Sequence, residues 1–217
     1  MAVTAKQTET DFKPCPEGNH TARCIGVVDM GTHPMEFAGQ KKMIHKIRIM
    51  WELPDEKRDD GKPFQISKDY GLSLHEKSTL RKDLEGWRGK RLTEKELSGF
   101  DIEVLAGKTC MINVLHKKST NGKTYANVTS VSSTPKGMKC PEQINDTILF
   151  SFENFSQKTY DALPKYIREK IMQTPEYQEA INPQTDITGG LVDDEEDSFT
   201  DQEAKKIQTE EDQNLPF

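Results

Sequence analysis

Lysine, arginine and aromatic side chains are the main candidates for chemistry in this chain of 217 residues. Cations neutralise phosphates, and exposed rings stack on unpaired bases with about 1 to 3 kcal/mol per base. These are the two ingredients of a surface that binds a single nucleic acid strand without reading its sequence. The cationic candidates are Lys46, Arg48, Lys68, Arg81, Lys82, Arg88, Lys90, Arg91, Lys117, Lys118 and Lys123, and the candidate rings are Trp51, Phe64, Tyr70, Trp87 and Tyr125.

Each of these residues also has a structural interpretation. Trp87 ends a predicted helix with an apolar face, which favours core packing, and Trp51 shares a strand face with isoleucines, which favours partial burial. Tyr70 and Tyr125 have polar neighbours and are expected to be partly exposed. Lys117 and Lys118 are either a solvated turn or, with Lys123 on the same hairpin, a clamp for a nucleic acid backbone.

Catalytic and metal-binding patterns are missing from the sequence. The five histidines show no metal-ligand spacing, and no nucleophile triad or phosphate-binding glycine loop is present. The cysteines Cys15, Cys24, Cys110 and Cys140 form no close pairs of the zinc-ribbon type, so we expect reduced thiols. The sequence therefore predicts a protein that is not an enzyme and that uses no metal or other cofactor.

Charge is divided unevenly along the chain. The whole chain has 30 Lys/Arg and 36 Asp/Glu, a net of −6. Residues 186–217 hold eleven Asp/Glu and two Lys, a net of −9, whereas residues 13–136 hold 22 Lys/Arg and 16 Asp/Glu, a net of +6. A basic body with an acidic tail is typical of nucleic-acid binders and of tails that mask their own binding surface. The alternative is that the tail only maintains solubility.

The foldable part has the size of one domain, because the acidic tail cannot bury apolar surface. No apolar run approaches the roughly 18 residues needed to span a bilayer, and the first residues lack the apolar stretch of a signal peptide. We therefore expect a cytoplasmic protein with no membrane partner.

Alternating apolar residues predict three consecutive strands over residues 21–31, 42–53 and 64–74, with a turn or bulge at Gly31. The period then changes to that of a helix over residues 79–87, with Ser78 as its cap, and a shorter turn over residues 93–98. Residues 108–116 and 124–131 are strand-like again, and Asn121-Gly122 between them predicts a hairpin.

This order of strands and helix is that of the five-stranded OB barrel, whose helix lies between strands three and four and whose surface binds oligonucleotides or oligosaccharides. Other small β-barrels with an inserted helix fit the same order. We predict a mainly β fold with a flexible leader (1–13), an OB-fold single-stranded-DNA-binding domain (14–136), a helical extension that packs on the barrel (137–182) and a disordered acidic tail (183–217).

Several segments resemble the OB-fold single-stranded DNA-binding proteins of bacteriophages and prophages. The resemblance covers residues 14 to about 177 and depends on the segments 22–24, 28–31, 73–80, 86–90, 107–108 and 122–128. It implies a protein that coats single-stranded DNA without sequence preference during phage replication or recombination, in the cytoplasm of a bacterial host.

The carboxyl terminus carries a second resemblance. Bacterial single-stranded DNA-binding proteins end in an acidic stretch closed by Ile-Pro-Phe or a similar tip, and here Asp212 precedes the tip Leu215-Pro216-Phe217. The chain departs from that pattern by placing Gln213-Asn214 before the tip. The similarity implies that Asp212, Leu215, Pro216 and Phe217 dock replication or recombination proteins.

A different hypothesis for the function is an adaptor, such as a helicase loader or a modulator of a host enzyme, that uses the barrel to bind proteins.

Overall fold

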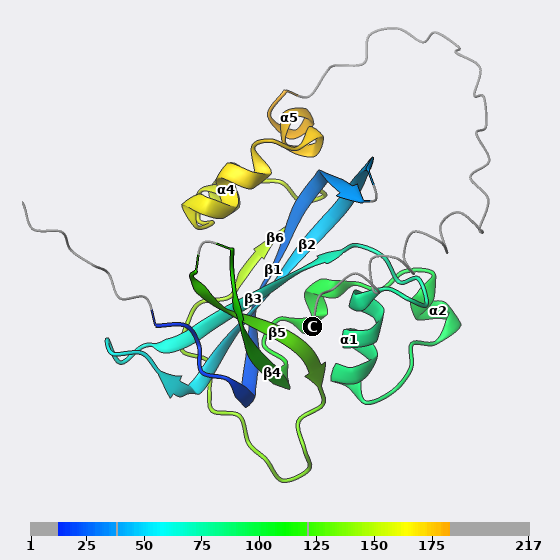
Figure 1. The fold of residues 1–217 in the computed structure, drawn as a ribbon. Helices are drawn as coiled ribbons and strands as arrows, with labels where there is room; N and C mark the ends of the chain where they lie inside the picture. Colours follow the sequence, from blue (N-terminus) through cyan, green and yellow to red (C-terminus); the bar gives the residue numbers. More distant parts are fainter. Residues whose placement is uncertain (1–12, 38, 121, 183–217) are drawn as a thin grey trace, which may run out of the picture.

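A computed structural model describes residues 13–37, 39–120 and 122–182. The fold is mainly β (Figure 1). The strands are β1 (Gly18–Phe37), β2 (Gln40–Lys57), β3 (Pro63–Gly71), β4 (Thr109–Lys118), β5 (Thr124–Ser132) and β6 (Ile148–Phe150). The helices are α1 (Thr79–Arg88), α2 (Glu94–Leu97), the 3-10 turn η1 (Ile102–Leu105), α3 (Gln157–Asp161), α4 (Lys165–Ile171) and α5 (Pro175–Ile181).

The strands form one sheet in the order β3-β2-β1-β4-β5. Neighbours in this order are antiparallel, whereas the short β6 pairs in parallel with residues 26–28 of β1. The sheet is not closed into a barrel, because β3 and β5 come into contact without pairing as a ladder. The predicted helix between the third and fourth strands is present as α1, and its cap Ser78 accepts a hydrogen bond from the amide of Arg81.

Two parts of the sheet differ from the sequence prediction. β1 and β2 extend well beyond the predicted ends and form a long two-stranded ribbon. Its register shifts twice, between Cys24 and Gly26 and between Asp29 and Gly31, and the second shift confirms the predicted bulge. The sixth strand was not predicted. This strand, β6, has only three residues, which pair with β1. It is too short to show an alternating apolar pattern in the sequence.

One core lies between the inner face of the sheet and helix α1. Trp51 and Trp87 meet there with ring centroids 5.9 Å apart, and the indole N–H of Trp87 donates to the carbonyl of Thr109 over 2.8 Å. Gly86 is required at the contact of α1 with β5, because a Cβ atom there would lie 2.4 Å from the carbonyl oxygen of Val131. This core therefore holds α1 across one end of the sheet.

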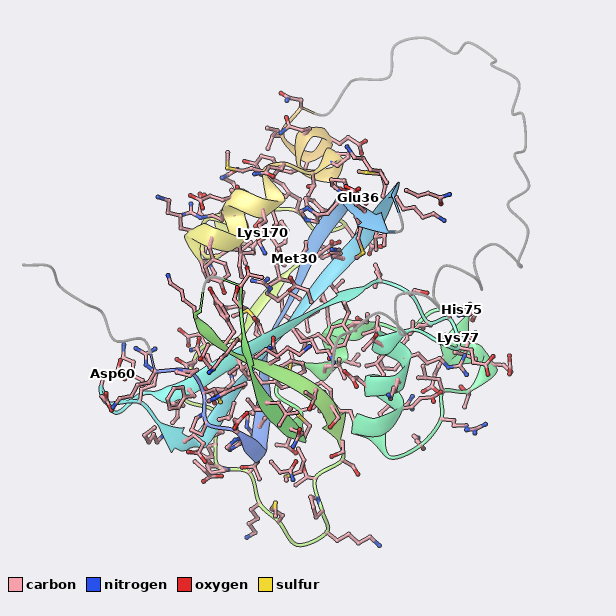
Figure 2. All side chains as sticks on the ribbon, viewed as in Figure 1. Met30, Glu36, Asp60, His75, Lys77 and Lys170 are labelled. Atoms are coloured by element: carbon pink, nitrogen blue, oxygen red, sulfur yellow. The ribbon has the colours of Figure 1, made fainter. Side chains whose placement is uncertain are left out.

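A second core lies on the outer face of β1 and β2, under α3, α4 and α5. Ile25, Val28 and Met30 of β1 pack against the buried residues of these helices, including Ile167 and Ile171, which have no exposed surface. Figure 2 shows Met30 beside the ribbon and Lys170 on the helices above it. The C-terminal helices therefore cover a sheet face that would otherwise be open, while the boundary at residue 136 stays a prediction.

Helix α5 is held to the β1–β2 ribbon by a polar cluster around His45. Its Nε2 lies 2.7 Å from Asp29 Oδ1, and its Nδ1 lies 3.3 Å from Glu176 Oε1 of α5. Glu176 also accepts hydrogen bonds from the amide and hydroxyl of Thr32. The close contact between β1 and the start of α5 requires Gly31, whose φ is +71°. A Cβ atom at this position would lie 2.8 Å from Thr174.

The attachment of α5 should weaken as pH rises. The hydrogen bond to Asp29, with help from Glu176, raises the pKa of His45 above its ordinary value. Because the pKa of His45 is higher in the folded state than in the unfolded state, protonated His45 stabilises the fold fully below about pH 6.5. This stabilisation is lost as the pH rises through the folded-state pKa. In thermal melts at about pH 6, the free energy of unfolding of the wild-type protein should exceed that of the His45→Gln variant by about 1 kcal/mol or less. At about pH 9 the two proteins should be equally stable. An equal difference at both pH values would contradict this.

Candidate functional site

The β4–β5 hairpin presents an exposed face that combines a ring with a cation. Lys117 lies directly across from Tyr125, and Leu115 lies across from Asn127, so these four residues share one face of the hairpin. Tyr125 is 47% exposed and Leu115 is 49% exposed, so the ring is available to a ligand. We call residues 115–120 and 122–127 the arm. This is the arrangement that stacking on an unpaired base requires.

The cations of the arm are concentrated near its tip. Lys117, Lys118 and Lys123 are all exposed, and the turn between them is closed by a hydrogen bond of 2.8 Å from the amide of Ser119 to the carbonyl of Lys123. Among the described residues, Lys117 and Lys118 make no ion pair. The arm therefore offers positive charge that no carboxylate of the described part neutralises at these two positions.

The sequence around the arm carries a further signal that the predicted site residues do not include. Residues 104–141 contain six lysines and no aspartate or glutamate. The structure exposes all six, which are Lys108, Lys117, Lys118, Lys123, Lys136 and Lys139. The net charge of +6 for residues 13–136 does not reveal this run, because acidic residues elsewhere in that range reduce the total.

The base of the arm is anchored to the segment that precedes β1. The Nε2–H of His116 donates to the carbonyl of Cys15 over 2.7 Å, and the amide of His116 donates to Glu17 Oε1 over 2.6 Å. Ala126, directly across from His116, packs against the inner core. These contacts fix the position of the arm as far as His116, the residue before Lys117.

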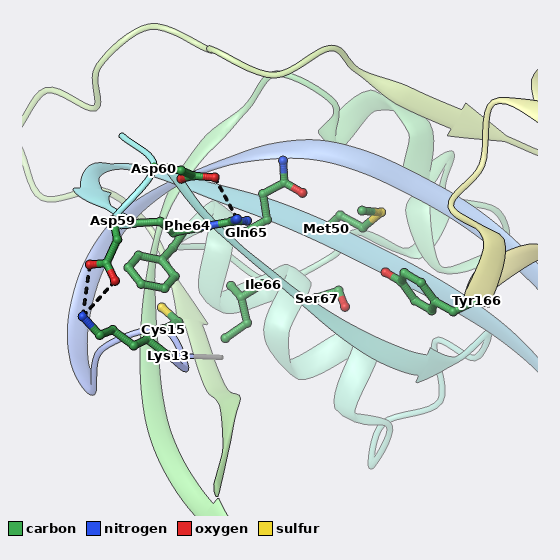
Figure 3. A pocket seen from close by; sticks show the side chains of 11 residues that line it. Lys13, Cys15, Met50, Asp59, Asp60, Phe64, Gln65, Ile66, Ser67 and Tyr166 are labelled. Carbon is green, nitrogen blue, oxygen red and sulfur yellow. Dashed lines mark hydrogen bonds and ion pairs between the residues drawn. The ribbon is translucent and has the colours of Figure 1, made fainter. Parts of the chain in front are cut away.

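A groove of about 400 Å³ runs along the exposed side of β3. Figure 3 shows Phe64 near one end and Tyr166 of α4 near the other, with Ile66 and Ser67 between them. Cys15 lines the same groove, so the anchor of the arm is also part of the groove wall. The remaining lining residues are Lys13, Met50, Arg58, Asp59, Asp60 and Gln65.

Three of the five candidate stacking rings, Trp51, Tyr70 and Trp87, are buried. Trp51 has no exposed surface and belongs to the inner core. Tyr70 is only 3% exposed, so the expectation that its ring is partly exposed is wrong. Helix α1 covers that face of β3, and Asp83 of this helix accepts a hydrogen bond of 2.8 Å from the Tyr70 hydroxyl. Neither ring can stack on a base in this structure. Phe64 is half-buried at the groove, and Trp87 belongs to the core, as its alternative interpretation held.

Three of the predicted cations pair with carboxylates on other elements of the fold. Arg48 is buried and donates to both oxygens of Asp69, over 2.5 and 2.7 Å. Lys68 lies 2.7 Å from Asp83. Arg88 bonds Glu96, and this contact together with Thr93 lowers the pKa of Glu96 to about 2. These three cations stabilise the fold instead of presenting free charge.

The other cations are distributed over different parts of the fold. Lys46 is half-buried on β2, across from Gly31 on one side and Gly71 on the other. Arg81 lies 3.2 Å from Glu85 within α1. Lys82, Lys90 and Arg91 are exposed on or beside α1. The structure therefore brings together Lys117, Lys118, Lys123 and Tyr125 but not the rest of the predicted set.

The cluster of Asp83, Lys68 and Tyr70 predicts a large effect of one substitution on stability. The Asp83→Ala change removes the carboxylate that pairs with Lys68 and leaves the ammonium beside the core without its partner. We expect a loss of about 3 kcal/mol in the free energy of unfolding, measured with urea. Asp146→Ala, at an exposed position, is the matched control and should change it by less than about 0.5 kcal/mol. Equal losses for both variants would contradict the assignment.

Burial of the tryptophans predicts a spectroscopic result. The chain has two tryptophans, and both lie in the inner core. Their emission should therefore be blue-shifted and resistant to iodide quenching, and saturating single-stranded oligonucleotide should leave it unquenched, because no base can reach the indoles. Strong quenching by the oligonucleotide would show that Trp51 or Trp87 becomes exposed and stacks.

No protein-family model matches the chain, and a search of curated proteins finds no similar protein. Among the described residues, no helix is long and apolar enough to cross a membrane. The same residues contain no group of three or more His, Cys, Asp or Glu that could hold a metal ion. The tail residues Asp212, Leu215, Pro216 and Phe217 lie outside the described residues.

Proposed function

We propose that the protein binds single-stranded DNA without sequence preference and coats it during phage DNA replication or recombination. The observation that carries this proposal is the arm, where exposed Tyr125 lies across from Lys117 in a stretch with six lysines and no acidic residue. Lysines bind phosphates of any sequence, and a ring stacks on the face of any base. A duplex keeps its bases stacked on each other, so the ring favours single strands.

The arrangement of the sheet supports an OB-type fold for this function. The order β3-β2-β1-β4-β5, with α1 between β3 and β4, is the order of the five strands of an OB fold, which is a partly open barrel. The contact between β3 and β5 without a ladder is compatible with such an opening. In OB folds the loop between the last two strands contacts oligonucleotides, and here that loop is the tip of the arm.

Charge removal from the arm should weaken binding in a salt-dependent manner. The triple variant Lys117→Ala, Lys118→Ala, Lys123→Ala should bind labelled single-stranded DNA more weakly in fluorescence polarisation. The slope of log affinity against log salt should become shallower by about 2, because each lost phosphate contact contributes about 0.7. The triple variant Lys82→Ala, Lys90→Ala, Lys95→Ala removes the same charge from α1, α2 and the segment between them, and it should bind more tightly than the arm variant. Equal losses would refute the arm as the contact.

An adaptor that binds other proteins is the second candidate function. It is favoured by the pairing of Arg48, Lys68 and Arg88 with carboxylates, which reduces the free positive charge of the body. An adaptor would show no steep dependence of oligonucleotide affinity on salt. The same titration with wild-type protein therefore separates the two functions.

We also propose that the acidic tail recruits replication or recombination proteins through Leu215-Pro216-Phe217 and covers the basic surface when DNA is absent. The net charges of −9 for residues 186–217 and +6 for residues 13–136 attract each other. Deletion of residues 193–217 should leave affinity for single-stranded DNA equal or higher while abolishing capture of the partner. Loss of DNA binding on truncation would refute masking.

A further inference from the structure

Tyr166 is an exposed ring on a helix whose other apolar side chains are buried. Ile167 and Ile171 of α4 have no exposed surface, whereas Tyr166 is 51% exposed. The ring lies at one end of the groove along β3 (Figure 3). The second core therefore accounts for the position of α4 without the help of Tyr166, and the ring is available for another contact.

Arg48 holds this ring in place. The carbon of its guanidinium lies 5.5 Å from the centroid of the Tyr166 ring, within the range of a cation–π contact. The guanidinium is itself fixed by the two hydrogen bonds to Asp69, and the Arg48 residue is only 7% exposed. A ring supported by a fixed cation loses little freedom when a ligand binds it.

The groove beside the ring has the chemistry of a site for an unpaired base. Its lining includes two apolar side chains, Ile66, which belongs to the inner core, and Met50, which belongs to the outer core, and the side-chain amide of Gln65 and the hydroxyl of Ser67 can bond base edges. Phe64 supplies a second, half-buried ring at the other end. From Phe64 to Ser67 the strand advances about 10 Å, at about 3.3 Å per residue.

We propose that this groove is a second subsite for the single strand that contacts the arm, with one base stacked on Tyr166. This inference rests on the proposed function. His116 connects the two places, because it bonds Cys15 of the groove wall and immediately precedes Lys117. Lys118 lies on the same strand face as His116, so its charge is on the side of the connection.

The charges of the groove favour a base over an acidic peptide. At the end near Phe64, Lys13 lies 2.9 Å from Asp59 and Arg58 lies 2.8 Å from Asp60. These pairs leave the mouth nearly neutral, so it would not attract an acidic segment. A strand whose phosphates are held by the lysines of the arm needs no further charge here, only a ring and groups that bond bases.

Two substitutions at one position test the subsite. Tyr166→Ser should weaken the binding of an oligo-dT to the full-length protein by about 5- to 150-fold, which corresponds to 1 to 3 kcal/mol for one stacked base. Tyr166→Phe keeps the ring and should bind like wild type. The matched control is Met172→Ser, which alters a side chain that is 50% exposed at the end of α4 and outside the groove lining. A thermal melting curve of each variant checks that the variant is folded.

Photocrosslinking provides a second readout that does not depend on affinity. An oligonucleotide containing 5-bromodeoxyuridine should crosslink to Tyr166 or Phe64, as mapped by mass spectrometry of the digested protein. If wild-type protein binds no single-stranded DNA, the proposed function itself is wrong. If it binds, but Tyr166→Ser binds equally well and no crosslink maps to the groove, the second subsite is wrong and the arm is unaffected; a groove that serves a peptide would give this second result.

Discussion

Burial of β1 on both faces is the constraint on which the rest of the structure depends. Its residues from Cys24 to Val28 are all buried, because Cys24 and Val27 enter the inner core while Ile25 and Val28 enter the outer core. The strand also pairs with β2, β4 and β6. A strand covered in this way can present no functional side chain from its centre, so binding groups have to lie on elements that extend beyond the two cores.

The distribution of usable charge follows from this arrangement. Covering the outer face of β2 with α3 to α5 buries Arg48, and such a cation needs the carboxylate of Asp69 because an unpaired buried charge is costly. Covering the inner face with α1 has the same consequence for Lys68, which pairs with Asp83. The arm extends past both layers, and its lysines Lys117, Lys118 and Lys123 stay exposed. The exposed cations of the arm therefore lie where the hairpin extends past both layers of helices.

A buried carboxylate also positions the connection between the sheet and the C-terminal helices. Glu52 of β2 has no exposed surface, yet it accepts hydrogen bonds from the amide of Ile144 and from the amide and side chain of Asn145. These three donors satisfy a charge that would otherwise be unstable in the interior. They hold the segment before β6 against β2, and β6 in turn leads into the helices that carry Tyr166.

The sequence by itself determined five of the six strands, the helix between β3 and β4 and the hairpin, because alternation, capping and an Asn-Gly turn are local properties of the chain. It also placed Lys117, Lys118, Lys123 and Tyr125 together, since a hairpin makes residues close in sequence close in space. Local pattern shows which residues share a face, but not which layer covers that face. Tertiary packing decided that Trp51 and Tyr70 are core residues, that Arg48 and Lys68 are ion-paired, and that Tyr166, far away in the chain, lies beside β3. These outcomes depend on contacts between distant segments, and no local period records them.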